Sequence, residues 1–391
     1  MAVTVEELVK FMVKQDASDV YVTVGVPPMY RIQGVTQPAG KQAFTPEITE
    51  ELANAMMNER QRKEFAETYE MNLALFYPNL GRFRVNIFRQ MNCVGIVIRQ
   101  IKTRIQTVEE LQLPPILNDI IMAKRGLVIV VGATGSGKST SLAAMVDYRN
   151  RNSPGHIITV EDPVEFVHPH KKSVITQREI GTDTLSFHHA LRNTLRQAPD
   201  VILVGEIRDL ETMEAAITFA ETGHLCLGTL HSNNANQAIE RIMNFFPPER
   251  HEQIYLQLAL NLRAIVSQRL IPSVEGKRLA AVEIMLNTPL VAEHIKRGEV
   301  DLLKEAMEKA IHEGSQTFDQ ALFTLYKDAR IGYDTALANA DSANNLKLKI
   351  KVSGLPVPGE KGPADFEFRE AEQVEHGKPG STARPKMGVK K

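Results

Sequence analysis

The segment GATGSGKS at 132–139 combines residue types that together bind nucleotide phosphates. It fits the pattern G-x-x-x-x-G-K-[ST], in which glycines let successive backbone N–H groups turn toward one anion. A helix beginning there would add partial positive charge, Lys138 would supply a point charge, and the Ser139 hydroxyl could ligate Mg²⁺. The apolar run before it and the helical pattern after it favour this interpretation over a glycine-serine linker. The predicted phosphate-binding residues are Gly132, Ala133, Thr134, Gly135, Ser136, Gly137, Lys138, Ser139 and Thr140.

An acidic residue, Glu206, follows the apolar run VILV at 201–204. Ligands of open α/β sheets bind at the carboxyl ends of the strands, so Glu206 is expected to point toward the nucleotide. Gly205 stands where nucleotide-hydrolysing sites usually carry a metal-binding aspartate. Glu206 is therefore predicted to hold Mg²⁺ through water or to orient a nucleophile, the alternative being a surface carboxylate.

A second acidic strand end has the sequence Glu161-Asp162-Pro163-Val164-Glu165. Pro163 is expected to stop the strand and to hold Asp162 in an extended or turn conformation. Glu165, just beyond the turn, could face a γ-phosphate and activate water as a general base. The alternative is a solvated acidic turn without a catalytic role.

Two histidines, His224 and His231, bracket the apolar run LCLGTL. Seven residues of strand span about 23 Å and reverse the side-chain face, so the pair is expected to have separate polar roles. His231 falls at the carboxyl end of this strand, near the predicted nucleotide. For each histidine, a hydrogen-bonded structural imidazole remains an equal alternative.

Several arginines lie in predicted strands of the first hundred residues. Alternation places Arg82 and Arg84 on one strand face, and Arg99 lies on a neighbouring strand. Guanidinium groups placed in this way could reach a phosphate across an interface. From the spacing alone, solvated side chains are the favoured interpretation.

Short apolar runs at 127–131, 157–160, 201–204 and 225–230 are typical of parallel strands buried on both faces. Helical stretches between them predict an α/β domain. Helical patterns continue from about residue 250 to 340, with one further strand expected at 279–285.

The predicted organisation is two folded domains and a tail. Residues 1–103 read as a mixed α and β domain that opens with an amphipathic helix, 104–116 as a linker and 117–343 as the α/β domain. Residues 344–391 are dense in proline, glycine and charge, and are expected to be disordered.

The composition excludes several classes of protein. With 46 Lys and Arg against 47 Asp and Glu, the net charge of −1 argues against a globally basic nucleic-acid coat. Cys93 and Cys226 are too few for a disulfide framework or a four-cysteine zinc site, which favours a reduced, cytosolic chain. No run approaches the roughly 20 apolar residues of a membrane-spanning helix. Any membrane association is therefore expected to be peripheral or through a partner.

Four boxes in fixed order, GATGSGKST, ITVEDPVEF, DVILVGEIRDLET and TGHLCLGTLHS, closely resemble those of the type II/IV secretion ATPases. SDVYVTVGVPPMYRIQG and GRFRVNIFRQ resemble the N-terminal domain of its PilT-like pilus retraction branch, and the resemblance covers about residues 3–330. It implies a PAS-like N-terminal domain, a RecA-like ATPase domain with a mostly parallel sheet, and a homohexameric ring. ATP would bind between the two domains.

The resemblance also implies roles for individual residues. Lys138 and Ser139 become the phosphate and Mg²⁺ residues, Glu165 the candidate general base, and Glu206 the acid that helps to hold Mg²⁺. The histidine pair and the arginines join the predicted ATP site, the arginines as candidate γ-phosphate sensors: His224, His231, Arg82, Arg84 and Arg99.

Two departures refine the resemblance. PilT-like motors carry an AIRNLIRE motif, whereas this chain reads LVAEHIKR at 290–297, and it extends some 50 residues past the usual end of the fold. Both point to the PilU-like paralogues, accessory retraction ATPases that act beside PilT. The implied partners are a PilT-like ATPase and the inner-membrane pilus platform protein, with no nucleic acid. The alternatives are an assembly-type secretion ATPase, against which the absence of a four-cysteine zinc insert argues, and an adaptor ring that docks on PilT.

Overall fold

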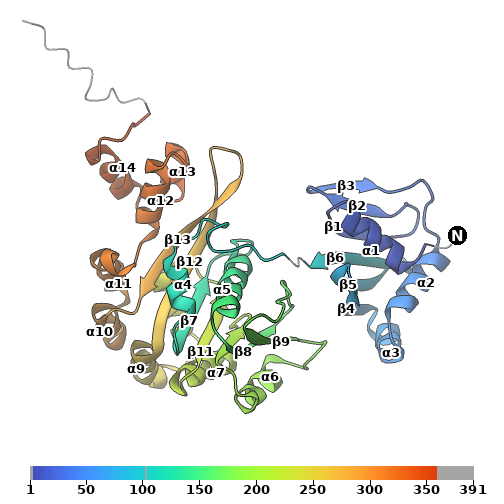
Figure 1. The fold of residues 1–391 in the computed structure, drawn as a ribbon, viewed down its shortest axis with the longest axis horizontal. Helices are drawn as coiled ribbons and strands as arrows, with labels where there is room; N and C mark the ends of the chain where they lie inside the picture. The colour runs from blue at the N-terminus through green and yellow to red at the C-terminus, as the bar shows by residue number, and fades with distance from the viewer. Residues whose placement is uncertain (1–2, 102–103, 359–391) are drawn as a thin grey trace, which may run out of the picture.

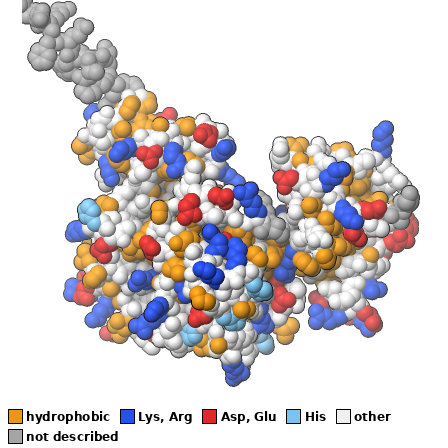
Figure 2. Space-filling model, viewed as in Figure 1, with side chains coloured by type: hydrophobic (Ala, Val, Ile, Leu, Met, Phe, Trp, Pro, Cys, Tyr) orange, Lys and Arg blue, Asp and Glu red, His pale blue; other side chains and the backbone are white. Residues whose placement is uncertain are grey.

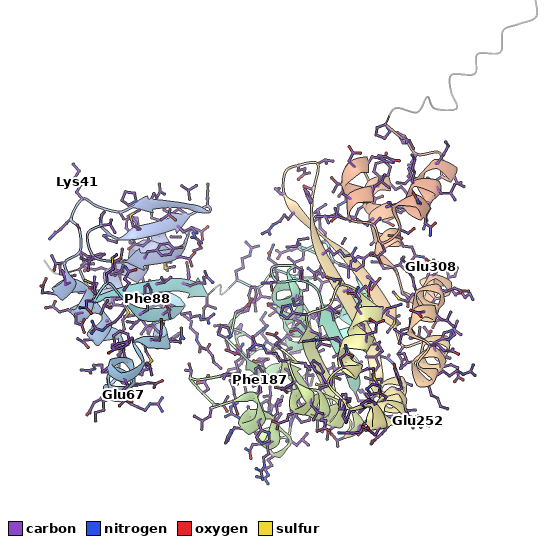
Figure 3. The ribbon with its side chains drawn as sticks, turned by 180° about the vertical axis from the view of Figure 1, so that it is seen from behind. Lys41, Glu67, Phe88, Phe187, Glu252 and Glu308 are labelled. Carbon is purple, nitrogen blue, oxygen red and sulfur yellow. The ribbon has the colours of Figure 1, made fainter. Side chains whose placement is uncertain are left out.

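The computed structural model describes residues 3–101 and 104–358. They form two units, each built around its own sheet, with side chains filling the space between the elements (Figures 1 and 3). Positive and negative side chains are interspersed over the face seen in Figure 2. None of the described helices is long and apolar enough to cross a bilayer.

The N-terminal unit is an antiparallel sheet of order β3-β2-β1-β6-β5-β4 with helices packed on it. Its first helix begins at a capping box between Thr4 and Glu7. Met57 is extended and Asn58 caps the next helix, so residues 46–68 form two helices rather than one. The elements are α1 (Val5–Lys14), β1 (Ala17–Val22), β2 (Met29–Ile32), β3 (Val35–Pro38), α2 (Pro46–Met56), α3 (Glu59–Thr68), β4 (Glu70–Tyr77), β5 (Gly81–Gln90) and β6 (Cys93–Ile101).

The second unit is a seven-stranded sheet of order β13-β12-β7-β11-β10-β8-β9, parallel except for β13. The apolar runs form its centre, and every residue of the strands β7, β10 and β11 is buried. The predicted α/β fold with a mostly parallel sheet is thus confirmed. The elements as far as β11 are α4 (Ile116–Ile121), β7 (Gly126–Val131), α5 (Lys138–Asn152), β8 (Gly155–Glu161), β9 (Ser173–Glu179), α6 (Phe187–Thr194), β10 (Val201–Val204), α7 (Leu210–Glu221) and β11 (Leu225–Leu230).

The elements that follow β11 correct one prediction. A strand, β12, stands within the stretch 250–340 where the sequence pattern indicated helices around a single strand. Its residues LRAIVSQRLIP pair with β7 on one side and β13 on the other, and this pairing outweighs the helical pattern of the neighbouring stretches. The elements are α8 (Ala235–Met243), α9 (His251–Asn261), β12 (Leu262–Pro272), β13 (Arg278–Leu286), α10 (Pro289–Arg297), α11 (Leu303–Lys309), α12 (Phe318–Lys327), α13 (Tyr333–Ala338) and α14 (Ala343–Val352).

Both ends of the second unit extend further than predicted. Val108 and Leu113, in the expected linker, are buried in its core. The prediction of disorder from residue 344 is wrong for α14, where Leu346 and Ile350 are fully buried in the cluster that contains Phe318. Two apolar residues at helical spacing suffice to dock this charged helix. The rest of the predicted tail, 359–391, lies outside the described residues.

Candidate nucleotide-binding site

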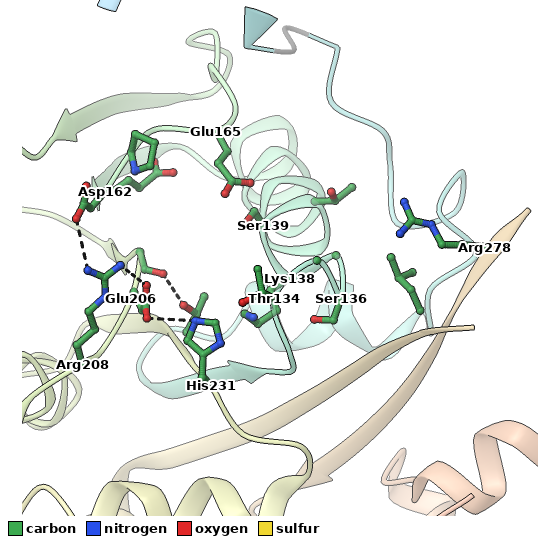
Figure 4. Close-up of a pocket in the computed structure, with 18 residues that line it drawn as sticks. Thr134, Ser136, Lys138, Ser139, Asp162, Glu165, Glu206, Arg208, His231 and Arg278 are labelled. Carbon is green, nitrogen blue, oxygen red and sulfur yellow. Dashed lines mark hydrogen bonds and ion pairs between the residues drawn. The ribbon is translucent and has the colours of Figure 1, made fainter. Parts of the chain in front are cut away.

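A cavity of about 650 Å³ opens where the strands β7, β8, β10 and β11 end (Figure 4). The carboxyl ends of parallel strands meet there, so loops from distant parts of the sequence share one space. Most of the polar residues singled out in the sequence line it. The lining residues are Thr134, Gly135, Ser136, Gly137, Lys138, Ser139, Thr140, Glu161, Asp162, Pro163, Glu165, Gly205, Glu206, Arg208, Thr229, His231, Leu270 and Arg278.

The phosphate loop forms one wall of the cavity. Gly132, Gly135 and Gly137 have positive φ angles of 151°, 76° and 91°, and a Cβ on Gly132 would lie 2.5 Å from a backbone oxygen of β12. Glycine is therefore required at the base of the loop. The helix α5 begins at Lys138 without a side-chain cap, so its first N–H groups are free for an anion.

Two polar groups of this loop fit a phosphate ligand. The Ser136 hydroxyl is buried and has no hydrogen-bond partner among the described residues. Lys138 Nζ donates to the carbonyl oxygens of Gly132 (2.7 Å) and Ala133 (3.1 Å), which are weaker partners than phosphate oxygens. Burial lowers the pKa of Lys138, and the negative charges of Glu206 and Glu165 oppose that shift. The loop thus offers donors that a triphosphate would satisfy.

The opposite wall is acidic, and Glu206 is tightly held there. Its carboxylate accepts a hydrogen bond from Arg208 at 2.7 Å and lies 3.2 Å from His231 Nε2. The Arg208 hydrogen bond lowers the pKa of Glu206; burial opposes the shift, and the charges of Arg208, His231 and Lys138 add to it. Glu206 is thus ionised and fixed in orientation. A Cβ on Gly205 would lie 3.0 Å from the Val160 oxygen, so an aspartate there would require the neighbouring backbone to shift by a few tenths of an ångström.

Glu165 lies beyond a turn that contains the cis Asp162–Pro163 peptide bond. Its side chain points into the cavity toward Ser139 (Figure 4) and accepts no hydrogen bond from a described residue. This carboxylate and the phosphate loop face each other across the space that a terminal phosphate and a water molecule would fill. Ser139 and Glu206 are the residues that fit a Mg²⁺ ion, since hydroxyl and carboxylate oxygens are its preferred protein ligands.

The two histidines are placed differently. His231 lines the cavity beside Glu206. His224 lies before the other end of β11, where its Nδ1 is 3.1 Å from the Thr222 hydroxyl and 3.2 Å from the Phe219 oxygen. His224 therefore does not line the cavity, because the six-residue strand β11 separates the two histidines, and its contact with a nucleotide stays a prediction.

None of the three predicted arginines lines the cavity in this structure. Arg82 pairs with Glu179 of the second unit at 3.1 Å. Arg99 donates to the buried carboxylate of Asp19 at 2.7 Å, and Arg84 lies opposite Arg99 in the register of β5 and β6. Of the three, Arg82 pairs with a residue of the second unit, and contact of these arginines with a nucleotide stays a prediction.

Three further residues, in or next to the cavity, were not predicted from the sequence. Arg208 orients Glu206, and its position two residues after that acid was an available signal. Arg278 lines the cavity from the start of β13. Gln268 lies beneath the loop, where its side-chain oxygen accepts a 2.7 Å hydrogen bond from the Ser141 hydroxyl of α5. The contact spans 127 positions, so only the fold brings it about.

A buried carboxylate on the other side of β12 fixes the segment that follows His231. Glu283 is 3% exposed and accepts hydrogen bonds from the backbone N–H of Ala235 (2.8 Å) and the Ser267 hydroxyl (3.0 Å). Burial raises the pKa of Glu283 to about 7; the charge of Asp341 adds to the shift, while these hydrogen bonds and Arg269 oppose it.

This raised pKa predicts a pH-dependent stability. Between the unfolded value of about 4.5 and the folded value of about 7, the folded chain keeps a proton that the unfolded chain has lost. The contribution of Glu283 to stability is thus fully present below the unfolded pKa and is lost as the pH rises toward 7. Against Glu283→Gln, the parent chain should lose about 1.4 kcal/mol per pH unit between about pH 5 and 7. Thermal or denaturant unfolding across this range measures the difference, with the exposed Glu293→Gln as a control that follows the parent.

Comparison with known proteins places the chain in a family. The model of the family described as "Type II/IV secretion system protein" matches residues 3–321. The chain belongs to this family. It is 56% identical over 348 residues to the type IV pilus ATPase PilU of Pseudomonas aeruginosa, covering 89% of this chain and 91% of that protein. The type IV pilus retraction ATPase PilT of the same organism is 41% identical, with 88% of this chain and 99% of that protein covered.

Solved structures of family members share the fold. The pilus retraction motor PilT, in a crystal structure with bound ADP, matches 88% of this chain and 99% of its own with a TM-score of 0.83 at 38% identity. The ATPase DotB of Legionella pneumophila matches 86% of this chain and 95% of its own with a TM-score of 0.70 at 25% identity. The similarity to the secretion family thus extends over both units.

Proposed function

We propose that the chain hydrolyses ATP in the cavity at the ends of β7, β8, β10 and β11. The observation that carries this proposal is the placement of a lysine-bearing phosphate loop opposite two carboxylates. The loop N–H groups, the Ser136 hydroxyl and Lys138 bind the phosphates and neutralise the charge that develops on them. The ADP bound to the similar PilT structure supports a nucleotide as the ligand.

The two carboxylates have different roles, one in activating water and one in binding Mg²⁺. Glu165, which has no competing hydrogen-bond donor among the described residues, orients a water molecule toward the terminal phosphate and takes its proton. Glu206, kept ionised by Arg208 and linked to His231, helps to hold Mg²⁺ together with Ser139. The bound ion would neutralise phosphate charge. His231 contacts Glu206 and lies four residues before α8, so a structural change caused by nucleotide binding is transmitted through it to that helix.

The mechanical output is retraction of a type IV pilus, and hence twitching motility. The similarity to PilU and PilT over about nine-tenths of the chain supports this output. The chain acts as a homohexameric ring at the cytoplasmic face of the inner membrane, beside a PilT-like ATPase and beneath the pilus platform protein. The higher identity to PilU, and the altered segment that forms α10, favour the accessory role over that of the main motor.

A retraction assay tests this function in cells lacking this protein, the PilT-like ATPase or both. Labelled pili are followed in living cells, and retraction events are counted against extension events. Loss of this protein should reduce the frequency or force of retraction while extension continues, and the double loss should add little to the loss of the PilT-like ATPase. Loss of extension would contradict the proposal and favour an assembly motor. Full rescue of retraction by a variant that cannot hydrolyse ATP would favour an adaptor ring.

A further inference from the structure

One buried carboxylate, Glu179, joins the two units of the chain. It ends β9, the edge strand of the second sheet, which lies on the side of that unit nearest the N-terminal unit (Figure 1). Its side chain is 7% exposed. The N–H groups of Asp183 and Thr184 donate to the Glu179 backbone oxygen, so the residue sits at the start of a tight turn.

Three donors occupy the Glu179 carboxylate. Oε2 accepts from Arg82 Nη2 of β5 at 3.1 Å and from the backbone N–H of Val164 at 3.2 Å, and Oε1 accepts from the Thr182 hydroxyl at 3.2 Å. Val164 stands between Pro163 and Glu165, both of which line the cavity. A single oxygen atom thus links an arginine of the N-terminal unit to the turn that carries the proposed general base.

Arg82 can pair either with the Glu179 carboxylate or with a phosphate group. A buried carboxylate is stable when a cation or several donors compensate it, and Arg82 is the only charged donor on Glu179 among the described residues. A guanidinium group binds phosphate oxygens with the same geometry as carboxylate oxygens. A terminal phosphate near Glu165 would therefore compete with Glu179 for the same arginine.

We propose that Glu179 is a positioning residue that holds Arg82 until ATP binds and releases it to the terminal phosphate as the units close. Because the same Glu179 oxygen accepts the Val164 N–H, the loss of Arg82 also shifts the turn that carries Glu165. The inference rests on the proposed ATP site. This role explains why Arg82 is paired outside the cavity in this structure. Closure of the two units would then act on the proposed base through the hydrogen bond between Glu179 and Val164. ADP lacks the terminal phosphate, so it cannot draw Arg82 away.

Binding of a non-hydrolysable ATP analogue and of ADP to the full chain, both with Mg²⁺, tests the proposal by calorimetry. Glu179→Gln keeps an oxygen for the Val164 N–H but removes the charge that retains Arg82. It should bind the analogue about 5–10-fold more tightly, since tenfold corresponds to about 1.4 kcal/mol, with ADP affinity unchanged. Arg82→Gln should weaken analogue binding alone, and Glu179→Gln should have no further effect in that background.

The control removes a more exposed ion pair of the N-terminal unit. Glu50→Gln breaks the Arg89–Glu50 pair, 3.2 Å long and confined to the N-terminal unit, and should leave both affinities at the parent's values. The proposal is overturned if Glu179→Gln binds the analogue no more tightly than the parent, or if both nucleotides change equally. A parent chain that binds neither nucleotide would instead overturn the proposed ATP site.

Discussion

Replacing Lys138 by alanine is expected to lower ATP turnover by about 10²–10³-fold, the usual effect of removing one group that stabilises developing charge. The lysine lies at the start of α5 with its Nζ within 3.1 Å of two loop carbonyls, so it is already aimed across the phosphate loop. No neighbouring cation replaces it among the residues that line the cavity, since Arg208 is engaged with Glu206 and Arg278 lies at the far side of the loop (Figure 4).

Phosphate release and nucleotide affinity measure this effect together. Lys309→Ala, an exposed lysine paired with Glu305 on α11, is the matched control and should keep the parent's rate. If Lys138→Ala hydrolysed ATP at a rate close to that of the control, the proposed role of the phosphate loop in hydrolysis would be contradicted.

The second large effect is expected for Glu165→Gln. The variant keeps the shape of the side chain but cannot take a proton, so the rate should fall by about 10²–10⁴-fold, the range of general base catalysis. ATP affinity should remain near the parent's value, because Glu165 contacts no residue of the phosphate loop by a hydrogen bond in the described chain. The variant should therefore accumulate bound ATP.

Rapid-quench analysis of bound ATP and ADP separates binding from chemistry in this variant. Glu211→Gln, an exposed glutamate on α7 beside His188, serves as the control for a lost surface carboxylate. If Glu165→Gln hydrolysed ATP at the control's rate, Glu206 would become the leading candidate for the base.

The parts of the site that the sequence predicted are those whose signal is local. The phosphate loop needs glycines at positive φ, a lysine and a following helix, all within nine consecutive residues. Glu206 and Glu165 each follow a short apolar strand, and the rule that parallel strands share a carboxyl edge brings them to one cavity.

The missed parts depend on pairing between distant segments. The strand β12 mixes polar and charged residues with apolar ones, and only its position between β7 and β13 makes it a strand. Gln268 and Glu283 acquire their contacts from that pairing. The resemblance predicts arginines at the site, whereas their pairing with Asp19 for Arg99 and with Glu179 for Arg82 arises only from the folded chain.

Release of inorganic phosphate from ATP by the purified full chain, with Mg²⁺ and with a chelator, tests directly whether the cavity is a hydrolytic site. We expect Mg²⁺-dependent hydrolysis that is lost in both Lys138→Ala and Glu165→Gln, while only Glu165→Gln still binds ATP like the parent. Hydrolysis that survives in both variants, or a parent chain that binds ATP with Mg²⁺ but never cleaves it, would contradict the assignment of this cavity as a hydrolytic site.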